Sequence, residues 1–280
     1  MTESTSGCFA ASGKQEGHNV INMYDVEPHV AEVYDQVETY ADDVELVRNL
    51  IGGRGPLRIL EPFCGTGRIL IPLALDGHRL VGLDQAKGML ARARAKIKQL
   101  PEEVQRRVIL TQADVTCEKW PQGFDLVILG GNCLYELATP QGQEGCIISA
   151  AASLNPGGYV YVDSNHMEGN LDESWQKPGV NQGFPTGTCV AGTLVESTVE
   201  TIWYDATRRL VKFRRCTKVT LLDGSIVEKE YIQQKHPVST VEVQTWLEAN
   251  RFVVEQLYGD RAGNPYTETS GRAIFWARKC

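Results

Sequence analysis

The sequence predicts an α/β fold in which helices cover both faces of a mainly parallel sheet, with an inserted antiparallel β region. Three observations lead to this prediction. Short apolar runs alternate with helical patterns between residues 57 and 163, which is typical of parallel strands joined by helices. Three long strand patterns over 193–235 follow one another without helices and indicate antiparallel strands. Two last strand patterns, 252–258 and 272–278, are expected to complete the first sheet as an antiparallel hairpin.

The composition limits the class of protein and its partners. A chain of 280 residues with 42% hydrophobic content is long enough for one large domain or a domain with a subdomain. Its formal net charge of −7 gives no overall attraction to phosphate backbones, so nucleic acid is not an expected partner. The eight cysteines form no Cys-x-x-Cys pair and no Cys/His cluster, so we expect no metal site and a reducing compartment.

No segment of the chain is typical of export or membrane insertion. Residues 1–19 lack the apolar stretch of a signal peptide, and no window has the apolar length needed to cross a bilayer. We therefore expect a cytoplasmic protein without a membrane partner. The sequence leaves the oligomeric state open.

Helices are predicted before the first strand. Apolar residues between Val26 and Ile51 recur at steps of three and four, as on one face of a helix. Glycines and a proline over 52–56 end this pattern. We expect one or two helices here, after a flexible start over 1–22.

The alternating core follows. Strands are predicted at 57–61, 79–83, 107–111, 124–129 and 158–163. Helices are predicted at about 67–76, 85–99 and 141–153. Because ligands of such sheets bind at the carboxyl ends of the strands, the site is expected there.

The inserted region begins with a glycine-rich loop over 164–192. Strands at 193–204, 209–222 and 225–235 follow, with Asp223-Gly224 as a hairpin turn between the last two. In the middle strand apolar residues share one face and basic residues the other, so one side of this sheet should be packed. Arg215 breaks the pattern because it falls on the apolar face.

Two acids and a glycine-rich turn stand at the ends of the first two predicted strands. Glu61 ends the first strand, and Gly65 and Gly67 supply a turn where backbone can approach a ligand. Asp84 ends the second strand, where a carboxylate can accept hydrogen bonds from both hydroxyls of a ribose. The arrangement predicts a nucleoside site.

Two residues narrow the nucleoside. Leu70 stands where a dinucleotide fingerprint has its third glycine, which argues against NAD and FAD. Glu61 would repel a pyrophosphate but attract an ammonium group. S-adenosyl-L-methionine combines a ribose, an amino group and no phosphate, and we expect it as the cofactor.

Several motifs resemble those of class I S-adenosylmethionine-dependent methyltransferases in order and spacing. They are Glu61 to Gly67, Gly82 to Asp84, Met89-Leu90, Asp114, Phe124 to Val127 and Leu154 to Gly158. The resemblance covers roughly residues 30 to 165 and 236 to 280. It implies a Rossmann-like seven-stranded methyltransferase sheet with helices on both faces and an inserted antiparallel β lid.

With this resemblance the chain divides into four predicted segments. They are a flexible N-terminus over 1–22, a helical cover and cofactor-binding core over 23–163, an antiparallel β lid with the substrate region over 164–238, and a C-terminal helix and strands over 239–280. Ser239 and Thr240 offer the cap of the C-terminal helix, which should run to Asn250.

The resemblance also assigns cofactor contacts. It places Met89 against the adenine ring, and Asp114 with Val115 beside the adenine amino group. The residues expected to bind the cofactor are Glu61, Phe63, Gly65, Gly67, Arg68, Asp84, Gln85, Met89, Asp114, Val115, Gly131 and Asn132. A helix cap at Asp84 and a solvated turn acid at Asp114 are the alternatives.

The stretch after the strand at 124–129 is similar to that of glycine N-methyltransferase-like enzymes. Asn132 matches their pattern and Cys133 departs from it. No residue of the insert matches their carboxylate-binding arginine, so glycine itself is not the expected substrate.

Methyl transfer requires an acceptor held in line at about 3–3.5 Å with water excluded. A base matters only where the acceptor must lose a proton, so an amine needs less help than a phenol or alcohol. His166 and His236 are the candidate bases because their pKa range is suitable, and surface histidines are the alternative. Tyr34, with Tyr40, is expected to close over the site from the helical cover.

The expected activity is methylation of a small molecule, at nitrogen before oxygen. Asn165 and Arg215 are the expected substrate contacts. An O-methyltransferase is the nearest alternative, and a non-catalytic S-adenosylmethionine-binding protein or a nicotinamide-dependent oxidoreductase are alternatives of other classes.

Overall fold

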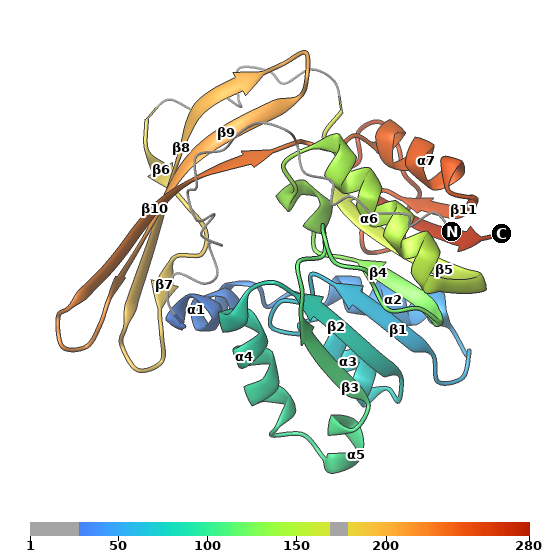
Figure 1. Ribbon diagram of the computed structural model, residues 1–280, viewed down its shortest axis with the longest axis horizontal. Helices are drawn as coiled ribbons and strands as arrows, with labels where there is room; N and C mark the ends of the chain where they lie inside the picture. Colours follow the sequence, from blue (N-terminus) through green and yellow to red (C-terminus); the bar gives the residue numbers. More distant parts are fainter. Residues whose placement is uncertain (1–27, 169–178) are drawn as a thin grey trace, which may run out of the picture.

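The computed structural model describes residues 28–168 and 179–280. They form a seven-stranded sheet and a separate, smaller antiparallel sheet that stands beside it (Figure 1). The expected flexible start over 1–22 lies outside the described residues, as does part of the expected loop over 164–192. The predicted boundaries between the four segments of the chain stay a prediction.

The large sheet has the strand order β11-β12-β5-β4-β1-β2-β3. Strands β1 to β5 run parallel, and β12 lies antiparallel between β5 and β11. The bounds are β1 (Arg58–Pro62), β2 (Arg79–Asp84), β3 (Val108–Gln112), β4 (Phe124–Leu129), β5 (Leu154–Asn165), β11 (Phe252–Tyr258) and β12 (Arg272–Lys279). This confirms the predicted fold class, including the antiparallel hairpin at the end of the chain.

Helices cover both faces of this sheet, and each face has its own core. One core includes residues of α2, α3, α4 and α5, and the other includes residues of α6 and α7. In Figure 1, α6 and α7 lie in front of the sheet and α2 lies behind it. The bounds are α1 (His29–Val37), α2 (Asp42–Ile51), α3 (Leu70–Leu75), α4 (Lys87–Ile97), α5 (Glu102–Gln105), α6 (Pro140–Ser153) and α7 (Thr240–Ala249), with a 3-10 turn η2 (Cys133–Glu136).

The cap of α7 is the one the sequence predicts. The Ser239 hydroxyl accepts from the backbone N–H of Glu242, whose carboxylate in turn accepts from the Ser239 N–H. Such a reciprocal pair satisfies two N–H groups that the first helical turn leaves unbonded.

One helix starts later than expected. The pattern predicts a helix from about residue 67, but α3 begins at Leu70. Gly65 and Gly67 have φ values of 53° and 78°, which no α-helix contains, so residues 65–69 form a turn instead.

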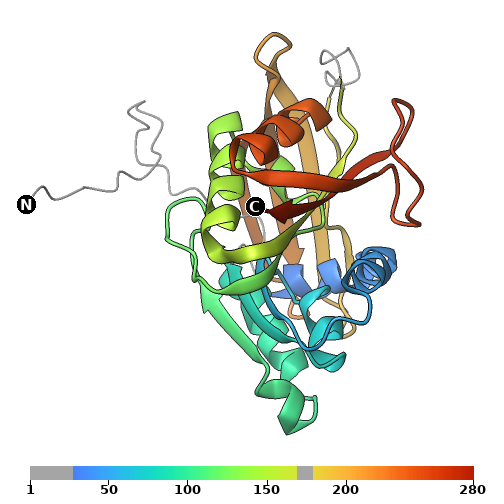
Figure 2. The ribbon, with the colours of Figure 1, turned by 90° about the vertical axis from the view of Figure 1, so that its right-hand side faces the viewer.

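The small sheet has the order β10-β9-β8-β6, with β7 also paired to β8. Its strands are β6 (Asn181–Gln182), β7 (Gly187–Thr188), β8 (Leu194–Asp205), β9 (Leu210–Thr220) and β10 (Ile226–Lys235). Strand β10 is an edge strand, and its end is tied to the core because the His236 N–H donates to the Leu137 carbonyl at 3.2 Å. The loop between β11 and β12 projects on the side of the N-terminal helices (Figure 2).

Within residues 28–168 and 179–280, none of the helices combines the length and apolar character needed to cross a membrane.

Candidate functional site

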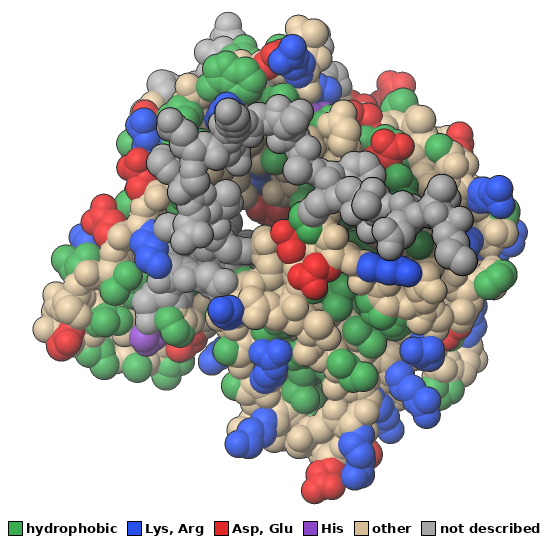
Figure 3. Space-filling view, viewed as in Figure 1, with side chains coloured by type: hydrophobic (Ala, Val, Ile, Leu, Met, Phe, Trp, Pro, Cys, Tyr) green, Lys and Arg blue, Asp and Glu red, His purple; other side chains and the backbone are tan. Residues whose placement is uncertain are grey.

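A cavity of about 450 Å³ joins the carboxyl ends of the core strands to the small sheet. This volume is in the range of pockets that hold small molecules. At one end lie residues of the turn after β1 and of the end of β2, and at the other end lie η2, the residues after it and β10. Figure 3 shows the molecule hollowed between the small sheet and the core, with acidic side chains at the edge of the hollow.

Most of the residues expected to bind the cofactor line this cavity. They are Glu61, Phe63, Gly65, Arg68, Asp84, Gln85, Met89, Val115 and Gly131. The other three, Gly67, Asp114 and Asn132, do not line it.

The turn after β1 has a backbone that side chains would disturb. Phe63 takes a φ of 63° although it is not glycine, and Gly65 follows with a φ of 53°. A Cβ on Gly65 would stand 3.3 Å from the Met89 Cε atom, and a Cβ on Gly67 would stand 3.2 Å from Ile71. Left-handed residues with so little space favour glycine, and the turn leaves backbone open to the cavity.

Glu61 is buried at the end of β1 with one carboxylate oxygen unpaired. The backbone N–H of Leu70 donates to its carboxylate. Its Oε2 atom has no hydrogen-bond partner among the described residues. Burial raises the pKa of Glu61 well above its usual range, and Asp43 and Asp84 add to the rise while Arg68 opposes it. An unpaired buried oxygen is costly, and a cation placed beside it would relieve that cost.

Asp84 orders the backbone on both sides of it. Its Oδ2 accepts from the Gly65 N–H at 2.8 Å, and its Oδ1 accepts from the Ala86 N–H at 2.8 Å. These bonds join the glycine turn to the start of α4. Each carboxylate oxygen accepts more than one hydrogen bond, so the carboxylate also has capacity for a ligand in the cavity.

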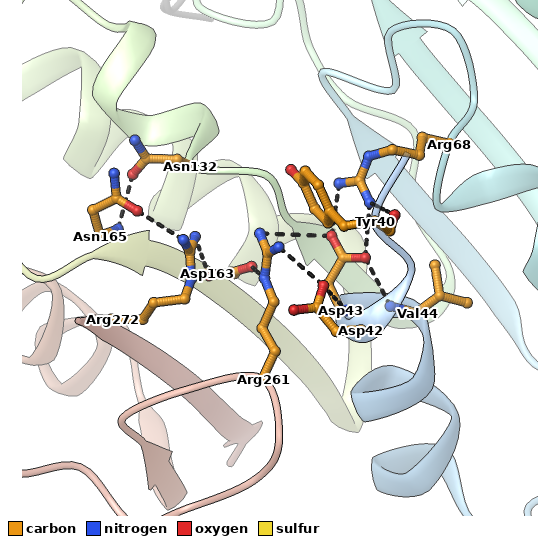
Figure 4. Close-up of polar contacts among 10 residues, drawn as sticks. All are labelled: Tyr40, Asp42, Asp43, Val44, Arg68, Asn132, Asp163, Asn165, Arg261 and Arg272. Atoms are coloured by element: carbon orange, nitrogen blue, oxygen red, sulfur yellow. Dashed lines mark hydrogen bonds and ion pairs between the residues drawn. The ribbon is translucent and has the colours of Figure 1, made fainter. Parts of the chain in front are cut away.

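A chain of alternating charges begins at Arg68, which lines the cavity, and runs through Asp43 and Arg261 (Figure 4). The Asp43 side chain is fully buried and accepts from both terminal nitrogens of Arg68, at 2.8 and 2.6 Å. Arg261, from the loop between β11 and β12, lies 3.8 Å from the same carboxylate. The ring of Tyr40 stands between the two guanidinium groups, 4.0 Å from Arg68 and 4.3 Å from Arg261.

The chain of charges continues to the end of β5. Fully buried Asp163 accepts from Arg261 at 2.9 Å and from Arg272 at 2.6 Å. Arg272 also donates to the Asn165 side chain at 2.7 Å, and the Asn165 N–H donates to Asn132 at 3.0 Å. The expected contacts Asn132 and Asn165 therefore lie in this chain, bonded to each other.

Each arginine of this chain of charges has a carboxylate partner. Arg68, Arg261 and Arg272 face two fully buried carboxylates, those of Asp43 and Asp163. Arg261 also bonds the exposed carboxylate of Asp42 at 3.1 Å, so three positive groups face three negative groups, and of these six residues only Arg68 lines the cavity.

Asp114 takes the turn position that the sequence analysis left open. Its Oδ1 accepts from the Thr116 N–H at 2.9 Å and from the Thr116 hydroxyl at 2.6 Å. The neighbouring Val115 is buried and lines the cavity.

The two histidines lie away from the lining. Nδ1 of His166 bonds the Tyr266 hydroxyl at 3.0 Å. His236 is buried between Gln143, 2.7 Å from its Nδ1, and Glu242, 3.4 Å from its Nε2. Burial lowers the pKa of His236, with Glu242 opposing. Neither ring is among the residues that line the cavity.

Tyr34 lies in the lining, on α1. Its ring meets the edge of Phe184 at a centroid distance of 5.7 Å. Burial raises the Tyr34 pKa far above its usual range, with nearby Arg68 opposing. A neutral phenol in this position closes the cavity and can donate one hydrogen bond.

Sequence reasoning missed the polar residues at the small-sheet end, chiefly Glu136, Tyr231 and Gln233. It also missed Asp43 and Arg261, the centre of the chain of charges. A partial signal for the first group existed in Arg215, which the β9–β10 register sets opposite Tyr231. No local motif marks Asp43 or Arg261, which lie far apart in the sequence.

Comparisons with known proteins agree with this geometry. Residues 59–158 match the family of methyltransferase domains. A Geobacillus sp. (strain WCH70) protein that carries the name of a methyltransferase is 24% identical over 231 residues, which are 81% of this chain and 87% of that protein.

Solved structures share the fold. A S-adenosylmethionine-dependent methyltransferase from Clostridium acetobutylicum ATCC 824 has a TM-score of 0.68 at 14% identity, over 89% of this chain and 97% of its own. The sugar N-methyltransferase KedS8 from Streptoalloteichus sp. ATCC 53650 has a TM-score of 0.67 at 18% identity, over 96% and 98%.

The fold is therefore that of class I methyltransferases. Residues 59–158 are a methyltransferase domain, and the chain is an S-adenosyl-L-methionine-dependent enzyme.

Proposed function

We propose that this enzyme methylates a small molecule at nitrogen. The observation that carries the cofactor half of the proposal is the buried, unpaired Oε2 of Glu61 at the end of β1. The ammonium of S-adenosyl-L-methionine supplies the cation that this oxygen lacks. A nicotinamide cofactor has no ammonium group to place there.

The other parts of the cofactor have complementary groups in the cavity. Arg68, a cation in the cavity lining, suits the carboxylate. Asp84 suits the ribose hydroxyls, and the buried side chains of Met89 and Val115 suit the adenine ring. We assign Asn132, Gly67 and Asp114 the role of shaping the backbone around these contacts.

The lining favours an amine over a phenol or alcohol as the acceptor. Bound S-adenosyl-L-methionine supplies a methyl group on a sulfonium that is already an activated leaving group. No histidine is found among the described residues that line the cavity, and Tyr34 is held neutral by burial. An amine in its neutral form needs no strong base, whereas an alcohol does.

The residues of the chain thus act mainly by binding and exclusion. The glycine turn and Gly131 bring backbone close to the ligand, and Tyr34 covers the cavity from α1. Neither Asn165 nor Arg215 lines the cavity, so we keep both as residues that support substrate binding indirectly: Asn165 bonds Asn132, and Arg215 lies opposite Tyr231. The likeness in fold to the sugar N-methyltransferase KedS8 supports nitrogen as the acceptor atom.

Calorimetric titration with S-adenosylhomocysteine and with NADH tests the cofactor half. We expect binding of the first and none of the second, and Glu61→Gln should weaken the first. Glu255→Gln is the matched control, because Glu255 lies on β11 and pairs with Arg278 away from the cavity.

A screen of amines, phenols and carboxylates for S-adenosylhomocysteine formation tests the acceptor half. We expect turnover with amines. Turnover of phenols alone would replace nitrogen by oxygen, and binding without any turnover would point to a non-catalytic protein.

A further inference from the structure

The far end of the cavity is polar where a packed sheet face should be apolar. The β9–β10 register sets Tyr231 opposite Arg215, Gln233 opposite Phe213 and Lys235 opposite Val211, so these residues share one face of the small sheet. Val211 and Phe213 are buried apolar residues, as expected of such a face. Arg215, Tyr231, Gln233 and Lys235 are polar residues on this otherwise apolar face, and we call them the polar island. Packing of the sheet does not require them.

Glu136, on η2, meets this island from the core side. Its Oε1 accepts from the Lys235 Nζ at 2.7 Å, and its Oε2 accepts from the Gln233 Nε2 at 3.1 Å. The Lys235 side chain is only 4% exposed, whereas 37% of the Glu136 side chain is exposed, and Glu136 lines the cavity. The lysine is therefore an anchor, and the carboxylate is the group that a ligand reaches.

Glu136 is held in its ionised form. Burial alone would raise its pKa, but Lys235 and Arg215 outweigh this effect and lower the pKa below its usual range. An ionised carboxylate only accepts hydrogen bonds, and it is too weak a base to deprotonate an alcohol. Its function is therefore to bind donor groups.

Gln233 adds a second acceptor. Its Oε1 is buried and has no hydrogen-bond partner within the described residues. Its Nε2 donates to Glu136, and the opposite orientation of the amide would set its oxygen against the carboxylate. The unpaired atom at this end of the cavity is thus an acceptor, like Glu136 itself.

We propose that Glu136 and Gln233 form the acceptor subsite, and that the acceptor is an aliphatic amine carrying hydroxyl groups. An amine that reacts must turn its lone pair toward the cofactor end, so its N–H groups and neighbouring hydroxyls face the opposite wall. Two acceptor side chains on that wall match two such donors. This inference rests on the proposed function of methylation at nitrogen.

Three amines test this proposal: cyclohexylamine, trans-2-aminocyclohexanol and glucosamine. Formation of S-adenosylhomocysteine gives kcat and KM for each. The wild-type enzyme should favour the hydroxylated amines over cyclohexylamine by at least about tenfold in kcat/KM, the size of one hydrogen bond to a charged group.

Gln233→Met keeps the side-chain length and removes the unpaired oxygen, and Glu136→Gln removes the charge. Each should reduce this preference by about tenfold through KM, with affinity for S-adenosylhomocysteine within about twofold of wild type. The double variant Glu136→Gln/Lys235→Met removes both charges together, so a folding defect from an unpaired buried lysine does not decide the result. Glu230→Gln is the control, since Glu230 lies on β10 but is exposed and pairs with Arg214.

The outcomes separate the two proposals. Equal kcat/KM for all three amines, or the same preference in the wild type, Gln233→Met and the double variant, overturns the acceptor subsite and leaves methylation at nitrogen standing. Turnover of phenols without any amine, or binding of S-adenosylhomocysteine without turnover, overturns the proposed function and the subsite with it.

Discussion

The two ends of the cavity are built in different ways. At the cofactor end, backbone fixes the geometry: Asp84 bonds the N–H groups of Gly65 and Ala86, and the turn itself has positive φ values. At the small-sheet end, side chains hold one another: Glu136 is fixed by Lys235 and Gln233. A site made from backbone depends on a short, continuous segment, whereas a site made from side chains changes with single substitutions. Fold and cofactor can thus stay constant while the acceptor differs.

The largest expected effect comes from breaking the backbone site. Gly65→Val forces a β-branched residue to a φ of 53° and places its Cβ 3.3 Å from Met89. We expect the affinity for S-adenosylhomocysteine, measured by calorimetry, to fall at least about hundredfold. Gly53→Val is the control, because a Cβ there meets nothing within 4 Å and its φ is not positive. Similar losses in the two variants would show that the turn is not special.

The next largest effect concerns the support beneath the cofactor end. Asp43→Asn removes a fully buried charge between Arg68 and Arg261. Because Arg68 then loses its carboxylate partner, while Arg261 keeps Asp163, the free energy of unfolding in urea should fall by about 3 kcal/mol. Asp42→Asn, at a neighbouring carboxylate that is 57% exposed and also bonds Arg261, should change it by less than about 1 kcal/mol. Equal effects would mean that burial of Asp43 does not matter.

A pH dependence should distinguish the cofactor end from the acceptor end. Burial raises the pKa of Glu61 in the folded protein well above the ordinary value of 4.5. The folded protein therefore keeps this proton over a pH range that begins near 4.5 and ends at the raised pKa. The stability gained from this proton is fully present below the unfolded pKa and is lost as pH rises through the folded pKa. A ligand ammonium favours the ionised form, so binding of S-adenosylhomocysteine releases a proton and strengthens by up to about tenfold per pH unit across the window. Titrations in buffers of different ionisation enthalpy measure this proton, and Glu61→Gln should abolish it.

The same contrast explains how far the sequence could predict the molecule. Alternating strand and helix patterns predict the α/β fold with a mainly parallel sheet. The segment from Glu61 to Asp84 indicates the cofactor. Both predictions depend on residues close in sequence. Asp43, Asp163 and Arg261 meet only after the N-terminal helices and the last hairpin pack onto the sheet. Their pairing depends on contacts between distant segments, which no local pattern encodes.

At the acceptor end the sequence gives one indication of a polar site, Arg215, and does not show which residues meet there. Arg215 on an apolar face indicated that something polar lay opposite, but Glu136 comes from a 3-10 turn with no motif of its own. The sequence indicates His166 and His236 by their usual pKa range and their place near strand ends, and the structure gives them partners outside the cavity lining. A residue's usual pKa says what it can do but not where the fold puts it.

The smallest expected effect is that of Arg215→Ala. It tests the comparison most closely, because the neighbouring Arg214 points to the other face of the same strand and serves as its control. Arg215 lies on the inner face of β9, where its buried Nε has no hydrogen-bond partner within the described residues and where it helps to keep Glu136 ionised. Arg215→Ala should therefore raise KM for the acceptor by about fivefold to tenfold while affinity for S-adenosylhomocysteine stays unchanged. Arg214→Ala is the matched control, since Arg214 is exposed on the other face and pairs with Glu200 at 2.7 Å. Such a surface pair contributes little, so Arg214→Ala should leave both constants near the wild-type values. If Arg215→Ala weakened cofactor and acceptor equally, its role would be to hold the two sheets together, and the division of the cavity into a backbone end and a side-chain end would not describe its function.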